Sequence, residues 1–520
     1  MGNELGKVRE SHGDQVSFVT VEEGRVSYGQ IVKICSGDGR SSKVFYSRIT
    51  NAGSRSTLEE VHELQDLRGS MRTVGPYSQY RYVESVLFLE REGSGDVRTP
   101  TLNPEYGWAV KPLEEADYSV LKLQGDLKLG CLRAGLSDGR RTVGLDVECI
   151  PRMMATVGQI GSGKTNAELV LNSALIATGG KAVGLIFDFA GELLTGKAIG
   201  KGLADSPFAE DGLVYFGLEN PEKPVSYAPI QIGLRRLSPK KLYFLLPDFS
   251  QPQEHYALKL RSKLGSEDWI SKAIGIYENE DVNGLLNIAD GQRNVAGALL
   301  RKLCSLDERV FPDVDHDFTA DIIRALTGGR SVLVDISGLR EGTQKQIVTW
   351  VAGCVVRYYR DLWRTDYEAW KHLPYLLITL EEAHKFLEEK GTIFSDIALT
   401  YRKYKVGLNA VTPRPSSINR DVFAELWTKI ILKTNLKDDR QYLAENTPYL
   451  EYSDVELKML DVGEALVVSQ PRIHFAVPIR VYGYKEYLEE HLEKAAEQLR
   501  DLKPPRRLEI KRSEIEENVL

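Results

Sequence analysis

Cysteine is scarce in this sequence, and no two cysteines lie close together. Five occur among 520 residues, and none forms a CxxC pair. They are Cys35, Cys131, Cys149, Cys304 and Cys354. This spacing argues against a zinc ribbon and against a disulfide framework, and it fits a protein of a reducing compartment.

Long apolar runs and a secretory signal are missing as well. No window approaches the ~18 uninterrupted apolar residues that cross a bilayer, so we expect no direct membrane insertion. The N-terminal stretch MGNELGKVRE carries charges of both signs and lacks the apolar centre of a signal peptide. We therefore expect a soluble, cytoplasmic protein.

An excess of basic residues, which often marks a nucleic-acid-binding protein, is absent too. The formal net charge is -7, so any nucleic-acid-binding surface must be local. The chain is 42% hydrophobic and 27% charged, which is an ordinary globular composition. Its length of 520 residues exceeds one ordinary core, so we expect about two or three domains.

The chain changes its pattern near Pro151. The preceding residues show short alternating strands separated by glycine, which predict a small β-barrel. Apolar runs alternating with helical stretches follow, and they predict an α/β fold with a parallel sheet covered on both faces. The six expected strands are 153–157, 182–188, 331–337, 375–380, 407–412 and 429–434.

We divide the chain into four parts on this basis. The barrel takes residues 1–140, and the α/β core takes 141–234 and 329–482. A helical insertion occupies 235–328. A C-terminal helix with a charged tail occupies 483–520, where the apolar residues step by 4, 3, 4 and 3, the spacing of a helix that packs on another helix. These residues are Leu488, Leu492, Ala495, Leu499 and Leu502.

A phosphate-binding loop follows the first expected core strand. The pattern G-x-x-x-x-G-K-[ST] is matched at every fixed position by Gly158, Gln159, Ile160, Gly161, Ser162, Gly163, Lys164 and Thr165. Glycines let backbone N–H groups turn toward an anion, and the following helix adds its positive end. Lys164 would reach the β- and γ-phosphates of ATP, and the Thr165 hydroxyl would coordinate Mg²⁺. We include the next residue, Asn166, in the nucleotide-binding set.

Two acidic residues follow another core strand, in YLLITLEEAHKF. Glu381 would hold Mg²⁺ through water, and Glu382 would polarise the attacking water. Paired acids also occur simply as helix N-termini, where the helix dipole favours negative charge. Asp188 and Glu192 in IFDFAGEL are candidates for a further acidic contact near the nucleotide. The alternative for these two is a polar loop after a strand.

Basic residues gather between Tyr401 and Arg440, with nine Lys/Arg against four Asp/Glu. Arg402 precedes a core strand, at the sheet edge opposite the phosphate-binding loop, so it could act on the nucleotide of a neighbouring subunit. Thr412, at the end of that strand, could sense the γ-phosphate. The alternative for each basic residue is a solvated surface.

These segments in this order resemble the HerA-like branch of the HerA/FtsK motor ATPases. The resemblance rests on the phosphate-binding loop, IFDFAGEL, LEEAHKF, RKYKVGLNAVTPRPS and VGEALVV. It implies a barrel of the ATP-synthase type, a RecA-like core and a hexameric ring. It also implies ATP-driven translocation of double-stranded DNA and, in archaea, a partner nuclease of the NurA type in DNA end processing.

The resemblance also assigns residues. Lys164 and Thr165 match the Walker A pair, and Glu381 and Glu382 match the Walker B pair. Arg402 matches the family's trans-acting arginine, and Arg152 matches an arginine that the family keeps before its loop. Three segments depart from the family. Inside the loop, Gln159 and Ile160 replace the more usual small residue and threonine. TPRP at 412–415 replaces Thr-Gln-Arg-Pro and lacks its glutamine, and YRKYK at 401–405 replaces Gly-Arg-Lys-Phe-Gly.

Three functions remain open on the sequence. The first is a ring motor that translocates on DNA. The second is a conjugation- or uptake-type ATPase that docks on a membrane channel. The third is a nucleotide-gated ring that serves as a scaffold for an effector nuclease. Basic residues that line a central pore would separate the first two from the third, because a translocating ring tracks phosphates with Lys and Arg.

Overall fold

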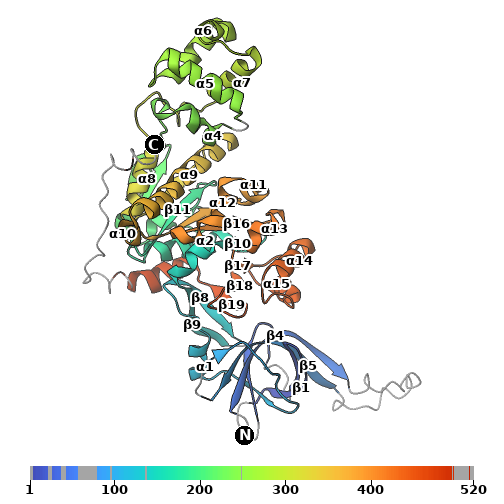
Figure 1. Ribbon diagram of the computed structural model, residues 1–520. Coiled ribbons are helices and arrows are strands. Elements are labelled where there is room, and N and C mark those ends of the chain that lie inside the picture. Colours follow the sequence, from blue (N-terminus) through green and yellow to red (C-terminus); the bar gives the residue numbers. More distant parts are fainter. Residues whose placement is uncertain are drawn as a thin grey trace. The chain divides into compact units, whose positions relative to one another are not determined.

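Figure 1 shows the computed structural model of the chain. The structure describes residues 4–20, 26–36, 42–56, 79–93, 97–134, 137–246 and 249–494, with Ala496 and Ile515. The chain forms two compact units. The first unit comprises Met1–Cys149, Met154–Glu168 and Thr412–Gly483, and the second comprises Ile150–Met153, Leu169–Val411 and Tyr484–Leu520.

The first unit begins with a closed antiparallel barrel, as the sequence predicts. Six strands follow one another in the order β2-β1-β7-β3-β4-β5, and pairing of β2 with β5 closes the ring. Closure leaves no free sheet edge in this ring. The six are β1 (Gly6–His12), β2 (Gln15–Thr20), β3 (Ile31–Cys35), β4 (Lys43–Ser56), β5 (Gln79–Glu92) and β7 (Ala109–Pro112).

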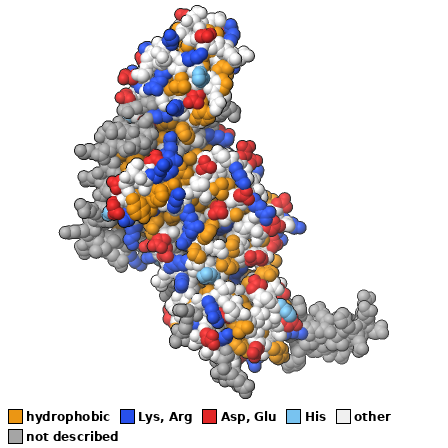
Figure 2. All heavy atoms as spheres, viewed as in Figure 1, with side chains coloured by type: hydrophobic (Ala, Val, Ile, Leu, Met, Phe, Trp, Pro, Cys, Tyr) orange, Lys and Arg blue, Asp and Glu red, His pale blue; other side chains and the backbone are white. Residues whose placement is uncertain are grey.

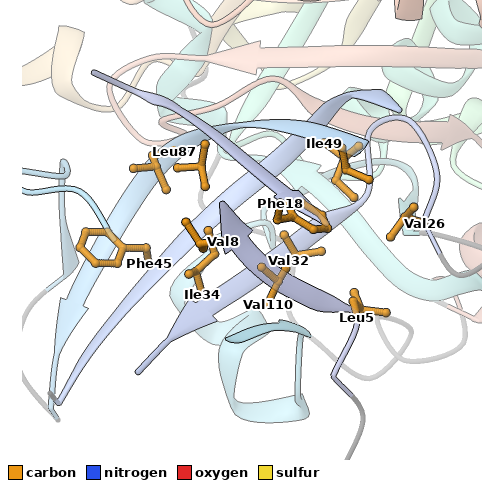
Figure 3. Close-up of a cluster of buried hydrophobic side chains, with 12 residues drawn as sticks. Leu5, Val8, Phe18, Val26, Val32, Ile34, Phe45, Ile49, Leu87 and Val110 are labelled. Atoms are coloured by element: carbon orange, nitrogen blue, oxygen red, sulfur yellow. The ribbon is translucent and has the colours of Figure 1, made fainter. Parts of the chain in front are cut away.

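Alternating apolar side chains fill the barrel. Val32 and Ile34 on β3 point inward with Phe18 on β2 and Val110 on β7 (Figure 3), and all four are fully buried. Lys33, between the two β3 residues, instead pairs with Asp117 outside this core, with 2.9 Å between Nζ and Oδ2. The alternation along the strands therefore matches the inside and outside of the barrel.

Six further strands of the first unit lie side by side outside the barrel, in the order β10-β17-β18-β19-β8-β9. The predicted ribbon at 462–481 is confirmed as the antiparallel pair β18 and β19. Strand β8 pairs with β19, and a Cβ at Gly130 would lie 2.2 Å from Arg480 O, so glycine is needed there. The strands are β8 (Leu127–Ala134), β9 (Ser137–Leu145), β10 (Met154–Val157), β17 (Thr428–Leu432), β18 (Glu464–Ser469) and β19 (Val477–Val481).

Six strands of the second unit run parallel to one another, in the order β13-β12-β14-β11-β15-β16. All six core strands that the sequence predicts are present, while β12 and β13 were not predicted. The strands are β11 (Ala182–Asp188), β12 (Leu213–Gly217), β13 (Ser226–Pro229), β14 (Ser331–Asp335), β15 (Tyr375–Leu380) and β16 (Val406–Thr412).

Helices accompany the parallel strands and build the insertion. Helix α2 (Lys164–Ile176) follows β10, and α9 (Glu341–Thr365) follows β14 and buries about half of its residues. Within the insertion, α5 (Gln251–Leu264), α6 (Trp269–Ile288) and α7 (Arg293–Cys304) pack against one another. Basic and acidic side chains are mixed on the surface of these three helices (Figure 2). The predicted fold class, an α/β core with a parallel sheet, a small barrel and a helical insertion, is confirmed.

The C-terminal helix packs on its own unit. Helix α16 (Tyr484–Tyr487) continues as a π-helical turn, Leu488–Leu492. The buried Tyr484 hydroxyl donates to Gly202 O at 3.0 Å and lies 2.8 Å from Ser173 Oγ. The rest of the predicted heptad, Ala495, Leu499 and Leu502, lies outside the described residues, as does the charged tail apart from Ile515. None of the helices in the described ranges is long and apolar enough to cross a membrane.

Candidate nucleotide-binding site

The phosphate-binding loop between β10 and α2 has the backbone that its glycines predict. Gly161 and Gly163 have φ angles of 79° and 100°, in the left-handed region that favours glycine. A Cβ at Gly158 would lie 2.7 Å from Ser162 Oγ and 2.8 Å from Leu432 Cβ. The loop therefore needs glycine at all three positions, for its conformation and for its close packing.

The segment Thr412–Gly483 of the first unit, far from the loop in the sequence, holds the loop through hydrogen bonds. Gln159 N–H donates to Lys433 O at 2.9 Å, and Asn435 N–H donates to Gln159 Oε1 at 3.1 Å. On the other side of the loop, Gly463 N–H donates to Ser162 O at 3.1 Å. Sequence reasoning gave none of these supporting residues a role, although VGEALVV, which contains Gly463, was among the segments that carried the resemblance.

Lys164 lies folded over the loop. Its Nζ donates to Gly158 O at 2.8 Å and to Gln159 O at 2.9 Å. The ammonium group is thus close to the loop backbone, on which phosphates bind in proteins with this motif. Asn166 has a different contact, because its amide Nδ2 donates to Tyr482 O at 2.8 Å and fixes the start of α2.

The loop fits the phosphates of a nucleotide. The first N–H groups of α2 have no acceptor within the helix and carry its positive dipole end. Ser162 Oγ is buried and has no hydrogen-bond partner among the residues that the structure describes. Ile160 is 87% exposed at the rim of the loop. Lys164 would hold the phosphates and Thr165 would supply a hydroxyl for Mg²⁺, which commonly binds through few protein oxygens together with substrate phosphates.

The second unit carries the acidic residues. Glu381 and Glu382 directly follow β15, and Glu381 Oε2 accepts from Phe189 N–H at 2.9 Å. Glu382 has a φ of 50°, which is uncommon for a residue other than glycine. Its Oε2 lies 3.6 Å from His384 Nε2. Strained backbone of this kind clusters at functional sites, so the strain at Glu382 supports its predicted catalytic role.

Asp188, at the end of β11, organises the loop that follows it. Its Oδ1 accepts from Gly191 N–H at 2.6 Å, and its Oδ2 accepts from Leu193 N–H at 2.8 Å. Burial, together with the nearby Asp335 carboxylate, raises the pKa of Asp188. Glu192 lies in this same loop, with its N–H 3.3 Å from Asp188 Oδ1. These contacts fit the alternative interpretation of Asp188 and Glu192, in which they belong to a polar loop that follows a strand.

A further acidic residue at this edge was missed from the sequence. Asp335 ends β14 in register with Asp188. It accepts from the Tyr215 hydroxyl at 3.0 Å and from Ser337 Oγ at 2.7 Å. The sequence placed Asp335 inside an expected strand, 331–337, so its position at the strand end could not be recognised. The carboxyl ends of three neighbouring strands thus carry Asp335, Asp188 and Glu381.

The structure does not bring Arg402 to the acidic edge of its own unit. Strands β15 and β16 run parallel, with Leu376 opposite Val406. Arg402 is exposed in the turn before β16, at the amino ends of these strands, whereas Glu381 and Glu382 follow the carboxyl end of β15. One copy of the second unit therefore holds the arginine and the glutamates at opposite sheet edges.

The two remaining predicted site residues, Thr412 and Arg152, lie at the end of β16 and just before β10. Thr412 ends β16 and is fully buried, and its Oγ1 accepts from Arg414 N–H at 3.0 Å. Arg152 is partly buried and ends the 3-10 helix Val147–Arg152, just before β10. Both stay candidates for nucleotide contacts.

Known proteins share this sequence pattern over most of the chain. Residues 128–353 match the family described as "Helicase HerA, central domain". A curated relative from Sulfurisphaera tokodaii, named DNA double-strand break repair helicase HerA, is 25% identical over 75% of this chain and 76% of its own. A relative of the same name from Pyrococcus furiosus is 25% identical over 66% of this chain and 67% of its own.

Solved structures with partial similarity to this chain include two further proteins. The bacterial conjugative coupling protein TrwB is 13% identical, with a TM-score of 0.47, over 70% of this chain and 91% of its own. VirB4 of Thermoanaerobacter pseudethanolicus is 14% identical, with a TM-score of 0.42, over 68% of this chain and 96% of its own.

Proposed function

The chain belongs to the HerA-like P-loop ATPases, and from this premise we propose that it is a hexameric ring motor that translocates on double-stranded DNA. It is an ATP hydrolase of the P-loop type. The observation that carries the proposal is the glycine-built phosphate-binding loop with Lys164 folded over it. The relatives named DNA double-strand break repair helicase support DNA as the substrate.

The two residues of the Walker A pair and the two of the Walker B pair each have a role in this proposal. Lys164 would neutralise the phosphates. Thr165 and, through water, Glu381 would hold Mg²⁺, which would supply further positive charge to the phosphates. Glu382 accepts a proton from the attacking water. Its strained backbone and the nearby His384 restrict the direction of the carboxylate.

The position of Arg402 supports the proposed ring. Within its own unit this residue lies at the sheet edge opposite Glu382. We therefore propose that Arg402 acts on the γ-phosphate bound by a neighbouring copy. Its charge would then meet the negative charge that develops in the transition state. Hydrolysis would depend on the arrangement of adjacent subunits, which is the coupling that a ring motor needs.

Replacement of Arg402 should separate ATP binding from turnover. Arg402→Ala should bind ATP like the unmodified protein but hydrolyse it about 1000-fold more slowly, the magnitude typical of an arginine finger. ATP binding is measured with a fluorescent analogue, and turnover is measured as phosphate release. Lys403→Ala is the matched control, because Lys403 is an equally exposed cation on the same turn.

Mixed rings test whether the arginine acts between subunits. Arg402→Ala supplies an intact Glu382, and Glu382→Gln supplies an intact Arg402. Mixing the two inactive proteins should restore part of the hydrolysis, because some interfaces then combine both functional residues. No recovery in rings shown to be mixed, or ordinary turnover by Arg402→Ala alone, would rule out the trans-acting role.

DNA is proposed as the track and a nuclease as the partner. A motor that grips the duplex through Lys and Arg releases counterions, so its affinity falls with salt and is independent of sequence. Linear double-stranded DNA of any sequence should therefore stimulate hydrolysis, and the stimulation should weaken as salt rises. We further propose that a NurA-like nuclease acts with the ring in DNA end processing.

A further inference from the structure

Glu464, the first residue of β18, is a buried carboxylate with three donors. Its Oε2 accepts from Arg133 Nη1 at 2.9 Å and from Asp461 N–H at 3.0 Å. Its Oε1 accepts from Arg480 Nη2 at 3.1 Å. The side chain is only 6% exposed. A carboxylate held by two guanidinium groups and a backbone N–H has a fixed position.

Glu464 closes the turn that supports the phosphate-binding loop. Its side chain accepts from Asp461 N–H, while its own N–H donates to Asp461 O at 3.0 Å. These two bonds lock the turn that carries Gly463, whose φ is 82°. Gly463 N–H donates to Ser162 O, and a Cβ on Gly163 would lie 3.3 Å from Gly463 N. The locked turn therefore lies directly against the loop backbone.

The same carboxylate is connected to the barrel. Arg133, which donates to Glu464, also donates through Nη2 to Glu456 Oε1 at 2.8 Å. Glu456 Oε2 accepts from Arg48 on β4, and Arg48 further donates to Ser453 Oγ at 2.6 Å. Glu456 is 1% exposed and Arg48 is 3% exposed. All of these residues belong to the first unit.

A continuous chain of charged hydrogen bonds thus runs from the barrel to the loop. We call Arg48, Glu456, Arg133 and Glu464 the arginine–glutamate chain. Each internal member is shared by two partners, so a shift of one member changes the geometry of the next. Replacing a partner of a buried charge by water costs free energy, so these pairs stay formed. A displacement of one side chain in the chain therefore displaces its partner. Phosphate binding depends on the direction of loop N–H groups, which a small shift in the support would change.

We propose that Glu464 is a positioning residue for nucleotide binding, and that the arginine–glutamate chain makes the affinity for ATP depend on the barrel. Glu464 acts through Gly463 and Ser162 and does not touch the nucleotide. A partner that shifts β4 would change the affinity for ATP, and ATP would change the affinity for that partner by the same factor. This inference rests on the proposed ATP binding at the loop.

Glu464→Ala in the full chain tests the proposal. The dissociation constant of a fluorescent ATP analogue and the KM for ATP should both rise about tenfold, which corresponds to about 1.4 kcal/mol. The turnover at saturating ATP should stay within about twofold, because no group that contacts the reacting atoms is lost. Glu464→Gln should show a smaller rise, about threefold, because its amide oxygen can still accept from Asp461 N–H. It serves as the test if the alanine variant does not fold.

A buried carboxylate of the barrel provides the matched control. Glu90 on β5, with a side chain 3% exposed, accepts from Arg98 Nε at 2.6 Å and from Thr101 N–H at 3.0 Å. Neither Arg98 nor Thr101 belongs to the arginine–glutamate chain. Glu90→Ala should lower the thermal stability, as Glu464→Ala does, but should leave the affinity for ATP unchanged.

The outcomes separate the inference from the function on which it rests. If the unmodified protein binds no ATP, the proposed function fails. If it binds ATP and Glu464→Ala binds equally well, or if Glu90→Ala weakens ATP binding to the same extent, the positioning role is overturned. Glu456→Gln should also weaken binding, and its effect should not add to that of Glu464→Ala, because both act on one chain. If the effects of the two substitutions on ATP binding add fully, the proposed dependence of ATP affinity on the barrel is overturned.

Discussion

Lys164→Ala should abolish ATP binding and hydrolysis by this protein. The ammonium group is the one cation within the loop motif, and it is already folded over the loop through Gly158 O and Gln159 O. Its removal leaves the β- and γ-phosphates without the one cation that the loop motif itself supplies. We expect turnover to fall by at least about 100-fold, the scale on which loss of one electrostatic stabiliser acts. Phosphate release and binding of a fluorescent ATP analogue measure the two effects.

A fold control accompanies this variant. Lys7→Ala removes the same charge from an exposed position on β1 and should leave ATP binding and turnover unchanged. Thermal unfolding without nucleotide should be similar for both variants. The addition of ATP and Mg²⁺ should raise the melting temperature of Lys7→Ala only, because a ligand stabilises the state that binds it. Ordinary hydrolysis by Lys164→Ala would contradict the assignment of the loop.

Glu382→Gln should bind ATP and hydrolyse it at least about 100-fold more slowly. A general base contributes about 10²- to 10⁴-fold, and an amide cannot accept the proton of the attacking water. The substitution preserves the size of the side chain. The backbone conformation at this position and the proximity of His384 to the side chain should therefore be unchanged. Single-turnover hydrolysis and analogue binding separate the chemical step from nucleotide binding.

Glu389→Gln is the control for this substitution. Glu389 is an exposed acid a few residues further along the chain, and its loss should leave hydrolysis unchanged. A Glu382→Gln protein that hydrolyses ATP at the rate of the unmodified protein would move the catalytic base to another residue. A variant that no longer binds ATP would instead give Glu382 a role in binding.

Local patterns were sufficient to predict the core strands that carry the site. Strand β11 and strand β15 are continuous buried apolar runs, which a sequence shows directly. Strand β13 could not be recognised, because its four residues are exposed or half-buried and include Pro229. Strand β12 is only five residues long and lies between glycines, so it is too short to stand out. Strand β12 is placed by pairing with β14, and β13 is placed by pairing with β12; the sequence shows neither pairing.

The phosphate-binding loop was predictable, but its supports were not. The spacing of glycines with Lys164 and Thr165 follows directly from how a backbone holds phosphate. Lys433 and Gly463 reach the loop from more than 250 residues away, through backbone groups that every residue possesses. Glu464 looks in the sequence like an ordinary acid at the start of a strand. Only its burial between Arg133 and Arg480 reveals its contacts.

The rate of ATP hydrolysis with and without linear double-stranded DNA is the measurement that tests the proposed motor most directly. Glu382→Gln serves as the blank for contaminating ATPases. A DNA-translocating ring should hydrolyse ATP much faster when DNA is present, and the stimulation should be similar for unrelated sequences and weaken as salt rises. An equal rate with and without DNA from low to high salt, in a protein that hydrolyses ATP through Glu382, would contradict the proposal that this ATPase is a DNA motor.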